Sequence, residues 1–174
     1  MTMTFWTWMS SPIGDMRLVA GGGVLRRVHL TERRDEPAPA AYGVERDDDP
    51  VLQQARRELD EYFAGARRRF EVPLGAEGSE FQRAVWAALM AVEFGAICSY
   101  ADIARAMGRP TATRAVGGAN NKNPIPIIVP CHRVVGSDRS LVGYGGGLER
   151  KRWLLAHEAR LVGAVFPGYD PPRC

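Results

Sequence analysis

The sequence predicts an α/β protein of two domains, a small α/β domain followed by a helical one. Three observations carry this prediction: β-branched and aromatic runs early in the chain, helical apolar periodicity after residue 50, and a change of composition near Gly78. With 174 residues, the chain is long enough to bury a core in each of two small domains. We place these domains at residues 1–78 and 79–174.

The first domain begins with three predicted strands. Residues 5–9, 16–19 and 24–30 are rich in β-branched and aromatic side chains, and glycine-containing turns separate them. Such short spacings predict an antiparallel meander. The following stretch, 31–49, is polar and rich in proline and charge, so we expect a mobile loop there.

One helix and one edge strand complete the predicted first domain. Asp49 is a suitable N-cap with Pro50 at the first helical position, and apolar residues then recur at helical spacing until Gly65. Residues 70–74 are extended in character, but Pro73 cannot donate a hydrogen bond to a neighbouring strand. We therefore expect an edge strand.

The second domain is predicted to consist of short helices. Ser79 and Gln82 have the spacing of a capping box before a helix that ends near Gly95. Ser99 is the expected cap of the next helix, which stops at Gly108.

A third helix is expected from about residue 112 to 120, which makes a helix-turn-helix with the preceding one. On spacing alone, an ordinary helical hairpin is the commoner explanation. Two features of the second helix favour DNA binding. Arg114 lies near its start, and Gly117 and Gly118 on the same helix permit close approach of a backbone.

The last predicted helix covers residues 148–160. Seven residues separate Lys151 from Glu158, which places both on the apolar face with Leu148, Leu154 and Leu155. A buried carboxylate needs a partner, and His132 would satisfy Glu158. A frayed helix end, with the Glu158 side chain in solvent, fits the periodicity equally well.

The strongest chemical signal is Cys131 beside His132 and Arg133. The preceding residues 125–129 are β-branched and interrupted by proline, so we expect a stiff extended segment that presents the cysteine. A thiol with a pKa near ~8.5 is mostly protonated at neutral pH and needs a neighbouring base or positive charge to react. An isolated Cys-His pair is more often a buried structural cysteine with a surface histidine.

The net charge of +3 hides an asymmetry between the two parts of the chain. Up to Gly78 there are 11 Lys and Arg against 13 Asp and Glu, whereas the remainder has 12 against 7. The basic excess therefore accompanies Cys131. It suits a polyanionic partner, although a modest excess also fits an ordinary solvated surface.

Localisation is inferred from the cysteines and from the start of the chain. Three cysteines are an odd number without the spacing of a disulfide framework. The first residues lack the basic start and long apolar core of a signal peptide, and the sequence has no apolar run near the ~18 residues of a membrane span. We expect a cytoplasmic protein with no membrane partner.

Residues 123–136 closely resemble the signature of the O6-alkylguanine-DNA alkyltransferases, which remove alkyl groups from guanine O6. The resemblance extends in order over nearly all of residues 79–160, whereas the first part of the chain resembles the family only in its turn at 11–14 and its size. It implies a ribonuclease-H-like first domain and a winged-helix-like second domain. The matching segments are 81–86, 99–104, 114–120, 143–147 and 154–158.

The resemblance implies irreversible, stoichiometric transfer of an alkyl group from O6-alkylguanine in double-stranded DNA to Cys131, with O4-alkylthymine as a further candidate substrate. His132 would be the base and Glu158 would orient it. Tyr100 would donate its phenolic proton toward guanine N3, and Asn123 would hold the active-site turns together. No cofactor is implied.

Chemistry at O6 requires the nucleotide to leave the base stack. The resemblance implies that Arg114 fills the gap left by the flipped base. Some relatives carry a structural zinc in the first domain, but that part of this chain has no cysteine, so we expect no metal. We expect a monomer that could bind cooperatively along DNA. The expected DNA-binding residues are Arg114, Ala115, Gly117, Gly118, Ala119 and Arg133, and the expected pocket residues are Tyr144, Gly145, Val134 and Pro126.

Three other functions share some of these sequence features. A cysteine hydrolase would also use Cys, His and Glu, but it needs an oxyanion hole and turns over repeatedly. A non-catalytic lesion-binding protein of related fold would lack the nucleophile that Cys131 provides. A transcriptional regulator fused to an alkyltransferase would need a further cysteine-rich domain, for which the chain is too short.

Overall fold

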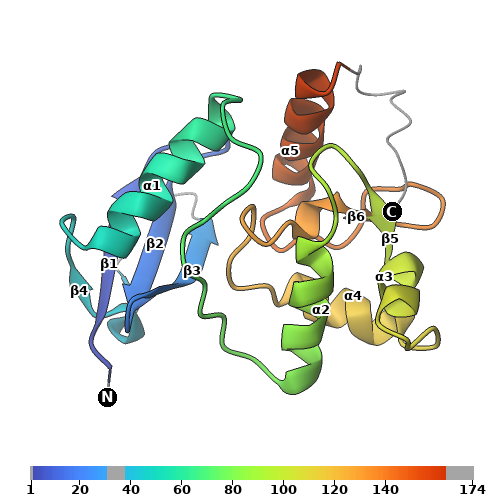
Figure 1. Ribbon diagram of the computed structural model, residues 1–174, viewed down its shortest axis with the longest axis horizontal. Helices are drawn as coiled ribbons and strands as arrows, with labels where there is room; N and C mark the ends of the chain where they lie inside the picture. Colours follow the sequence, from blue (N-terminus) through green and yellow to red (C-terminus); the bar gives the residue numbers. More distant parts are fainter. Residues whose placement is uncertain (1, 31–37, 164–174) are drawn as a thin grey trace. The chain divides into compact units, whose positions relative to one another are not determined.

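The computed structural model describes residues 2–30 and 38–163 and divides into two compact units, Met1–Glu77 and Gly78–Cys174. The first unit contains a four-stranded sheet and one long helix, and the second contains four helices around a two-stranded sheet (Figure 1). The predicted α/β class is confirmed. Within the described residues, no helix is long and apolar enough to cross a membrane.

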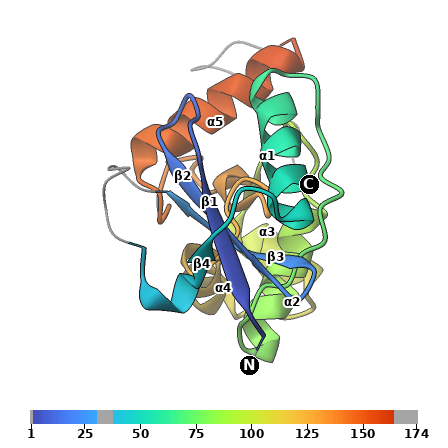
Figure 2. The same cartoon turned by 90° about the vertical axis from the view of Figure 1, so that its left-hand side faces the viewer.

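The sheet of the first unit has the order β3-β2-β1-β4. As predicted, β1 (Thr4–Met9), β2 (Met16–Gly21) and β3 (Val24–Leu30) form an antiparallel meander. All six residues of β2 are buried, because it lies between two strands and helix α1 packs against the sheet (Figure 2).

The predicted mobile loop contains a strand that the sequence did not reveal. Residues 31–37 lie outside the described part of the chain, but Ala40–Tyr42 form a 3-10 turn, η1, and Val44–Glu45 form β4. Strand β4 pairs in parallel with Phe5 and Trp6 of β1, and the Arg46 guanidinium stacks on the Phe5 ring at 4.8 Å. Two residues are too few for a periodic pattern, which is why composition alone suggested a loop.

Helix α1 (Pro50–Phe63) begins as predicted. The Asp49 carboxylate accepts hydrogen bonds from the backbone N–H groups of Val51 and Leu52, at 3.0 and 3.1 Å. These bonds satisfy donors that a helix start leaves free. The predicted apolar face is buried and comprises Leu52, Ala55, Leu59 and Tyr62.

The predicted edge strand at 70–74 is wrong. Only Leu74 forms a bridge, in parallel with Leu25, and the flanking hydrogen bonds are Leu25 N–H to the Pro73 carbonyl at 2.7 Å and Gly75 N–H to the Leu25 carbonyl at 2.8 Å. The buried Glu58 carboxylate holds the preceding backbone by accepting from the N–H groups of Glu71 and Val72. The segment is therefore held at its end by a single bridge to β3 and before it by the Glu58 side chain, and it forms no continuous strand.

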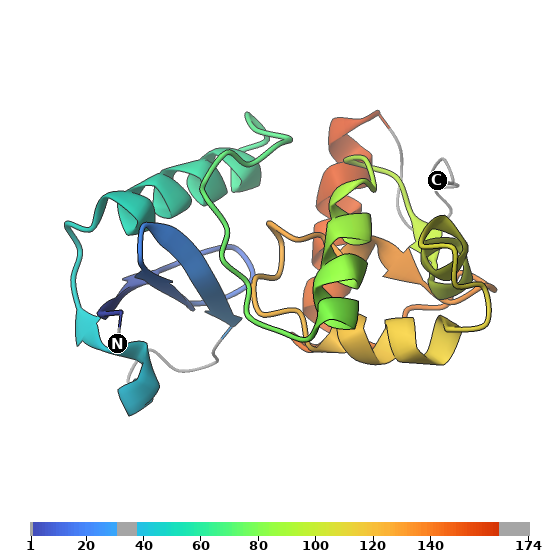
Figure 3. The same cartoon turned by 60° about the horizontal axis from the view of Figure 1, so that its bottom comes forward.

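Helices in the second unit begin where the sequence predicted them. Helix α2 (Glu80–Met90) follows a complete capping box between Ser79 and Gln82, and α3 (Tyr100–Ala106) follows one between Ser99 and Asp102. Helix α2 ends at Met90, earlier than expected. Helix α4 (Thr113–Asn121) packs against both α2 and α3, so the pair α3 and α4 has the layout of a helix-turn-helix (Figure 3).

The segment before Cys131 is not extended, contrary to expectation. The Val129 N–H donates to the Ile125 carbonyl at 2.9 Å and closes a turn, in which Ile127 has φ of 75°. This left-handed conformation is unfavourable for a β-branched residue, and complete burial of the Ile127 side chain offsets its cost. Proline and isoleucine therefore mark a tight turn here.

Cys131–Arg133 form a second 3-10 turn, η2, which runs directly into β6 (Val134–Val135). Strand β6 pairs in parallel with β5 (Cys98–Ser99), immediately before α3. The last helix, α5 (Leu148–Leu161), packs against η2. Helix α3 and helix α5 thus approach the Cys131 segment from two sides.

Candidate active site

Cys131 is a free thiol at the start of η2, and only 4% of the residue is exposed. Burial raises the pKa of this thiol to about 11, although Asn123 and the positive charge of Lys151 act in the opposite direction. At neutral pH the group is therefore protonated in the absence of substrate. Any reaction of Cys131 as a nucleophile needs a base that acts when the substrate arrives.

His132 and Glu158 come together as the sequence suggested. The His132 Nε2 lies 2.8 Å from Oε1 of Glu158, and both side chains are buried. Because a carboxylate only accepts hydrogen bonds, Nε2 carries the proton and Nδ1 carries the lone pair. Nδ1 is buried without a hydrogen-bond partner. Burial lowers the pKa of His132 more than Glu158 raises it, so the imidazole is neutral at rest and can accept a proton.

Arg133 lies inside the unit, which does not fit the expected DNA-binding role. Its Nε and Nη2 donate to the two oxygens of Glu158 at 2.9 and 3.0 Å, and its Nη1 donates to the Val92 carbonyl at 2.6 Å. The two-point ion pair and the bond to Val92 together engage all three nitrogens of the guanidinium inside the unit. Glu158 also accepts from the Gly95 N–H, at 3.0 Å. Despite burial, His132 and Arg133 hold the pKa of Glu158 far below its usual range, so it is ionised.

The sequence predicts Lys151 on the apolar face of α5 and indicates no chemical role for it. The residue is completely buried, and its Nζ donates to the carbonyls of Val134 at 2.5 Å and Val142 at 2.7 Å. Burial lowers the pKa of Lys151 to about 8. The only sign of this buried ammonium in the sequence is a lysine within an otherwise apolar stripe. Leu148, expected on the same face, is exposed.

Asn123 ties together the turn before Cys131. Its Nδ2 donates to the Val129 carbonyl at 2.8 Å and its Oδ1 accepts from the Ile125 N–H at 3.0 Å. The Cys131 N–H in turn donates to the same Val129 carbonyl, at 2.8 Å. Pro126, half-buried, lies in this turn and forms a bridge with Val129.

Tyr100, at the start of α3, reaches the loop between β6 and α5. Its hydroxyl donates to the Val142 carbonyl at 3.0 Å. The loop must have glycine at 143, where φ is 63° and a Cβ would lie 2.8 Å from the Tyr100 oxygen. A Cβ at Gly145 would lie 3.3 Å from the Asn121 carbonyl, so this position is also close to α4.

Tyr144, in the same loop, is buried with a hydroxyl that has no hydrogen-bond partner. Burial, and to a lesser extent the charge of a Cys131 thiolate, raises the pKa of both Tyr100 and Tyr144. Both phenols therefore remain neutral and able to donate a hydrogen bond. Val134, the other predicted pocket residue, is completely buried in β6.

Comparisons with known proteins agree with this arrangement. Residues 80–160 match the model described as 6-O-methylguanine DNA methyltransferase, DNA binding domain, and residues 4–76 match the corresponding ribonuclease-like domain. The methylated-DNA--protein-cysteine methyltransferase of Mycobacterium leprae is 44% identical over 154 residues, which cover 88% of this chain and 92% of that protein. The chain belongs to this methyltransferase family.

Other members of the methyltransferase family give the same result. The protein of that name from Haemophilus influenzae is 40% identical over 159 residues, or 91% of this chain and 88% of that protein. Among solved structures, the Mycobacterium tuberculosis OGT in complex with DNA has a TM-score of 0.80 and 41% identity, and the match covers 93% of this chain and 96% of that one.

The DNA binding domain of the family model includes α4, whose predicted contact residues fall into two groups. Arg114, Ala115 and Gly118 are exposed, and Gly117 is half-buried with a potential Cβ 3.8 Å from the Tyr100 ring. Ala119 is buried, and its carbonyl accepts a hydrogen bond from the Trp86 indole at 2.9 Å. Ala119 therefore supports the helix from inside, which does not fit the expected DNA contact.

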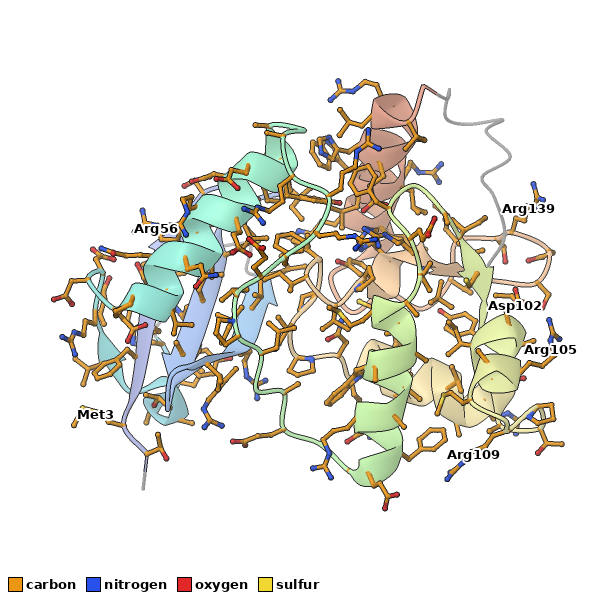
Figure 4. All side chains as sticks on the ribbon, viewed as in Figure 1. Met3, Arg56, Asp102, Arg105, Arg109 and Arg139 are labelled. Atoms are coloured by element: carbon orange, nitrogen blue, oxygen red, sulfur yellow. The ribbon has the colours of Figure 1, made fainter. Side chains whose placement is uncertain are left out.

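A cavity of about 220 Å³ lies elsewhere in the unit, against β5 and the loop after β6. Asp102, Arg105 and Arg139 line it, and Figure 4 shows these three side chains at the same outer edge. None of the predicted site residues lines this cavity. Among the described residues, no cluster of three or more His, Cys, Asp or Glu side chains could hold a metal ion.

Proposed function

We propose that this protein repairs DNA by direct reversal, transferring an alkyl group from O6 of guanine irreversibly to Sγ of Cys131. Family membership supports transfer of a methyl group to a cysteine, since relatives of this chain are named methylated-DNA--protein-cysteine methyltransferases. The observation that carries the residue assignment is the buried free thiol of Cys131, which is followed directly by a histidine hydrogen-bonded to a buried carboxylate.

The reaction begins with removal of the thiol proton. His132 Nδ1 accepts it through an intervening water molecule, because adjacent residues of a 3-10 turn point about 120° apart and their side chains do not face each other. Glu158 stabilises the resulting imidazolium across the 2.8 Å hydrogen bond. Burial keeps His132 neutral until the substrate is bound, and the charge of Arg133 beside Glu158 acts in the same direction.

Alkyl transfer follows as a displacement at the alkyl carbon. The bond from Sγ to carbon forms while the bond from carbon to O6 breaks, and its electron pair stays with the guanine. The thiol proton held by His132 then returns, through solvent, to the guanine ring. The products are a neutral thioether and neutral guanine. Regeneration of the thiol would require a nucleophile to displace the Cys131 thiolate from an unactivated alkyl carbon, so the protein acts once.

Tyr100 assists departure of the guanine. In the absence of DNA its hydroxyl donates to the Val142 carbonyl, so donation to guanine N3 requires exchange of this hydrogen bond. The raised pKa keeps the Tyr100 phenol protonated, so it can donate a hydrogen bond to guanine N3 without complete proton loss. Tyr144, Gly145, Val134 and Pro126 form the surroundings of the base in this proposal, and Asn123 fixes the turn behind Cys131.

The substrate is double-stranded DNA from which the alkylated nucleotide is flipped, with O4-alkylthymine as a second candidate. Arg114 is exposed on α4 and would occupy the gap in the base stack, while the small residues Ala115, Gly117 and Gly118 let the helix approach closely. The DNA binding domain that includes these residues supports this assignment. We propose a cytoplasmic monomer, and titration with oligonucleotides of increasing length would reveal cooperative binding along DNA.

The test is intact mass after the protein is mixed with an O6-methylguanine oligonucleotide. We expect one added methyl group per protein, located on Cys131 by peptide mapping, and a reaction that stops at one equivalent of DNA. The matched Cys131→Ser variant should gain no methyl group while keeping its fold. Sustained turnover beyond one equivalent would contradict irreversible transfer and favour a hydrolase, and a methyl group on another residue would contradict the assignment of Cys131.

A further inference from the structure

Helix α5 presents two buried charges on one face. Lys151 and Glu158 are seven residues apart, which is two helical turns, and both are almost completely buried. Glu158 holds His132 and Arg133, and Lys151 holds the carbonyl of Val134, the next residue. The three residues that follow Cys131 are therefore all bound to one rigid helix.

Lys151 also connects this segment to the opposite side of the site. The Val142 carbonyl accepts hydrogen bonds from both Lys151 Nζ, at 2.7 Å, and the Tyr100 hydroxyl, at 3.0 Å. One ammonium group thus links β6, the loop that carries Tyr144 and the donor Tyr100. Its three N–H donors on a compact head suit two converging carbonyls.

The charge of Lys151 has no carboxylate partner within salt-bridge distance in the described part of the chain. A buried ammonium without a counter-ion is costly, and an apolar residue would cover this part of α5 at lower cost. Of the 23 lysines and arginines, only Lys122 and Lys151 are lysines. Lys151 Nζ donates to the carbonyl of Val134, three residues after Cys131 on the same short segment, so its charge favours the Cys131 thiolate.

We propose that Lys151 is a positioning residue for alkyl transfer, whose ammonium holds the Val134 and Val142 backbones in place and favours the thiolate of Cys131 during attack. This inference rests on the proposed function. Lys151 keeps its proton throughout, while His132 takes the thiol proton. The other titratable and charged groups that face this region are His132 and Arg133 on η2, Glu158 on the same helix, and Tyr100 through the shared Val142 carbonyl.

Three substitutions separate the charge of Lys151 from its hydrogen bonds. Lys151→Arg keeps the charge, Lys151→Gln keeps a donor without the charge, and Lys151→Met loses both at similar length. Lys122→Met is the matched control, because Lys122 is exposed at the end of α4. Each variant is first checked for folding by circular dichroism, so that rates refer to folded protein.

Two readouts are required. The first is the rate at which iodoacetamide labels Cys131 near pH 7, where Lys151 is protonated, with the same variant carrying Cys131→Ser as the blank. The second is the single-turnover rate of methyl transfer from an O6-methylguanine oligonucleotide at saturating DNA. We expect the Gln and Met variants to contain on the order of tenfold less Cys131 thiolate at this pH, the equivalent of about one pKa unit, and so to be labelled about tenfold more slowly. Their transfer rates should fall by at least a similar factor, and Arg should restore part of both.

Unchanged labelling of Cys131 near pH 7 in the folded Gln and Met variants would overturn the proposal, even where their thermal stability is altered. Unchanged transfer rates would overturn it equally. A wild-type protein that accepts no methyl group would instead refute the proposed function, and the labelling comparison would still decide whether Lys151 acts on the thiol.

Discussion

Among the described residues, each of the two units buries one glutamate almost completely, but the two carboxylates have different partners. Glu58 in the first unit accepts from the Gln54 amide and from the N–H groups of Glu71 and Val72, at 2.8, 2.8 and 3.1 Å. Glu158 in the second unit binds Arg133 and the titratable ring of His132. A network that ends on neutral amides fixes structure, whereas one that leads to a buried histidine with a free lone pair can also move a proton.

The buried cations differ in the same way. Arg17 in the first unit lies between aromatic rings, with its guanidinium 5.0 Å from the Trp6 ring and 4.3 Å from the Trp8 ring. The faces of these rings stabilise a cation at fixed positions. Lys151 in the second unit donates to two carbonyls and, in our proposal, favours the thiolate of Cys131. Buried charge in the first unit therefore stabilises the fold, and in the second it lies around the proposed nucleophile.

The largest expected effect follows from Glu158→Gln. The variant keeps a side chain of similar size but loses the charge that stabilises the His132 imidazolium. The single-turnover transfer rate should fall ~10²–10⁴-fold, the range that acid-base support contributes in enzymes. Stability should fall as well, because Arg133 is left as an unpaired buried cation. Rates are therefore measured on folded protein, and a wild-type rate in folded Glu158→Gln would show that Glu158 has no part in proton transfer.

Arg114→Ala should show an intermediate effect that depends on the substrate. Filling the gap in the base stack offsets part of the few kcal/mol that unstacking costs, so repair of duplex DNA should slow on the order of 10- to 100-fold. Reaction with free O6-benzylguanine needs no flipping and should stay near the wild-type rate. Equal losses on both substrates would assign Arg114 to folding or chemistry.

Glu58→Gln is the matched substitution in the first unit and should have the smallest effect on transfer. Hydrogen bonds from Gln54, Glu71 and Val72 outweigh burial and lower the pKa of Glu58. Its ionised form therefore stabilises the fold above the unfolded-state pKa, and this stabilisation is lost as the pH falls through the lower folded-state value. At neutral pH the variant should lose about 1–3 kcal/mol in urea unfolding. A reduced transfer rate would remove the distinction between the two units.

Local signals in the sequence were sufficient for much of the fold. The capping boxes at Ser79 and Ser99 and the cap at Asp49 place three helices correctly, because caps depend on a few neighbouring residues. The spacing from Lys151 to Glu158 likewise places Glu158 on the buried face of α5, where it meets His132.

Contacts between distant segments account for what the sequence did not reveal. Arg133 carries a charge that suits DNA, and only the folded chain shows that Glu158 and the Val92 carbonyl occupy it. Ile127 adopts a left-handed turn because Asn123 and burial hold it there, although β-branched residues locally favour extended backbone. Lys151 binds the backbone carbonyls of two valines, and a backbone acceptor cannot be recognised from a side-chain pattern.

The central claim is that burial keeps Cys131 protonated until substrate binds, although the nearby charge of Lys151 favours the thiolate. The most direct measurement is the ultraviolet absorbance of the thiolate against pH in wild-type protein without DNA, with Cys131→Ser as the reference that cancels the other cysteines and tyrosines. Burial raises the pKa of Cys131 to about 11, so the difference signal should be absent at neutral pH and rise only in strongly alkaline solution. A thiolate signal that is already complete at pH 7 would contradict the account, because Cys131 would then need no base.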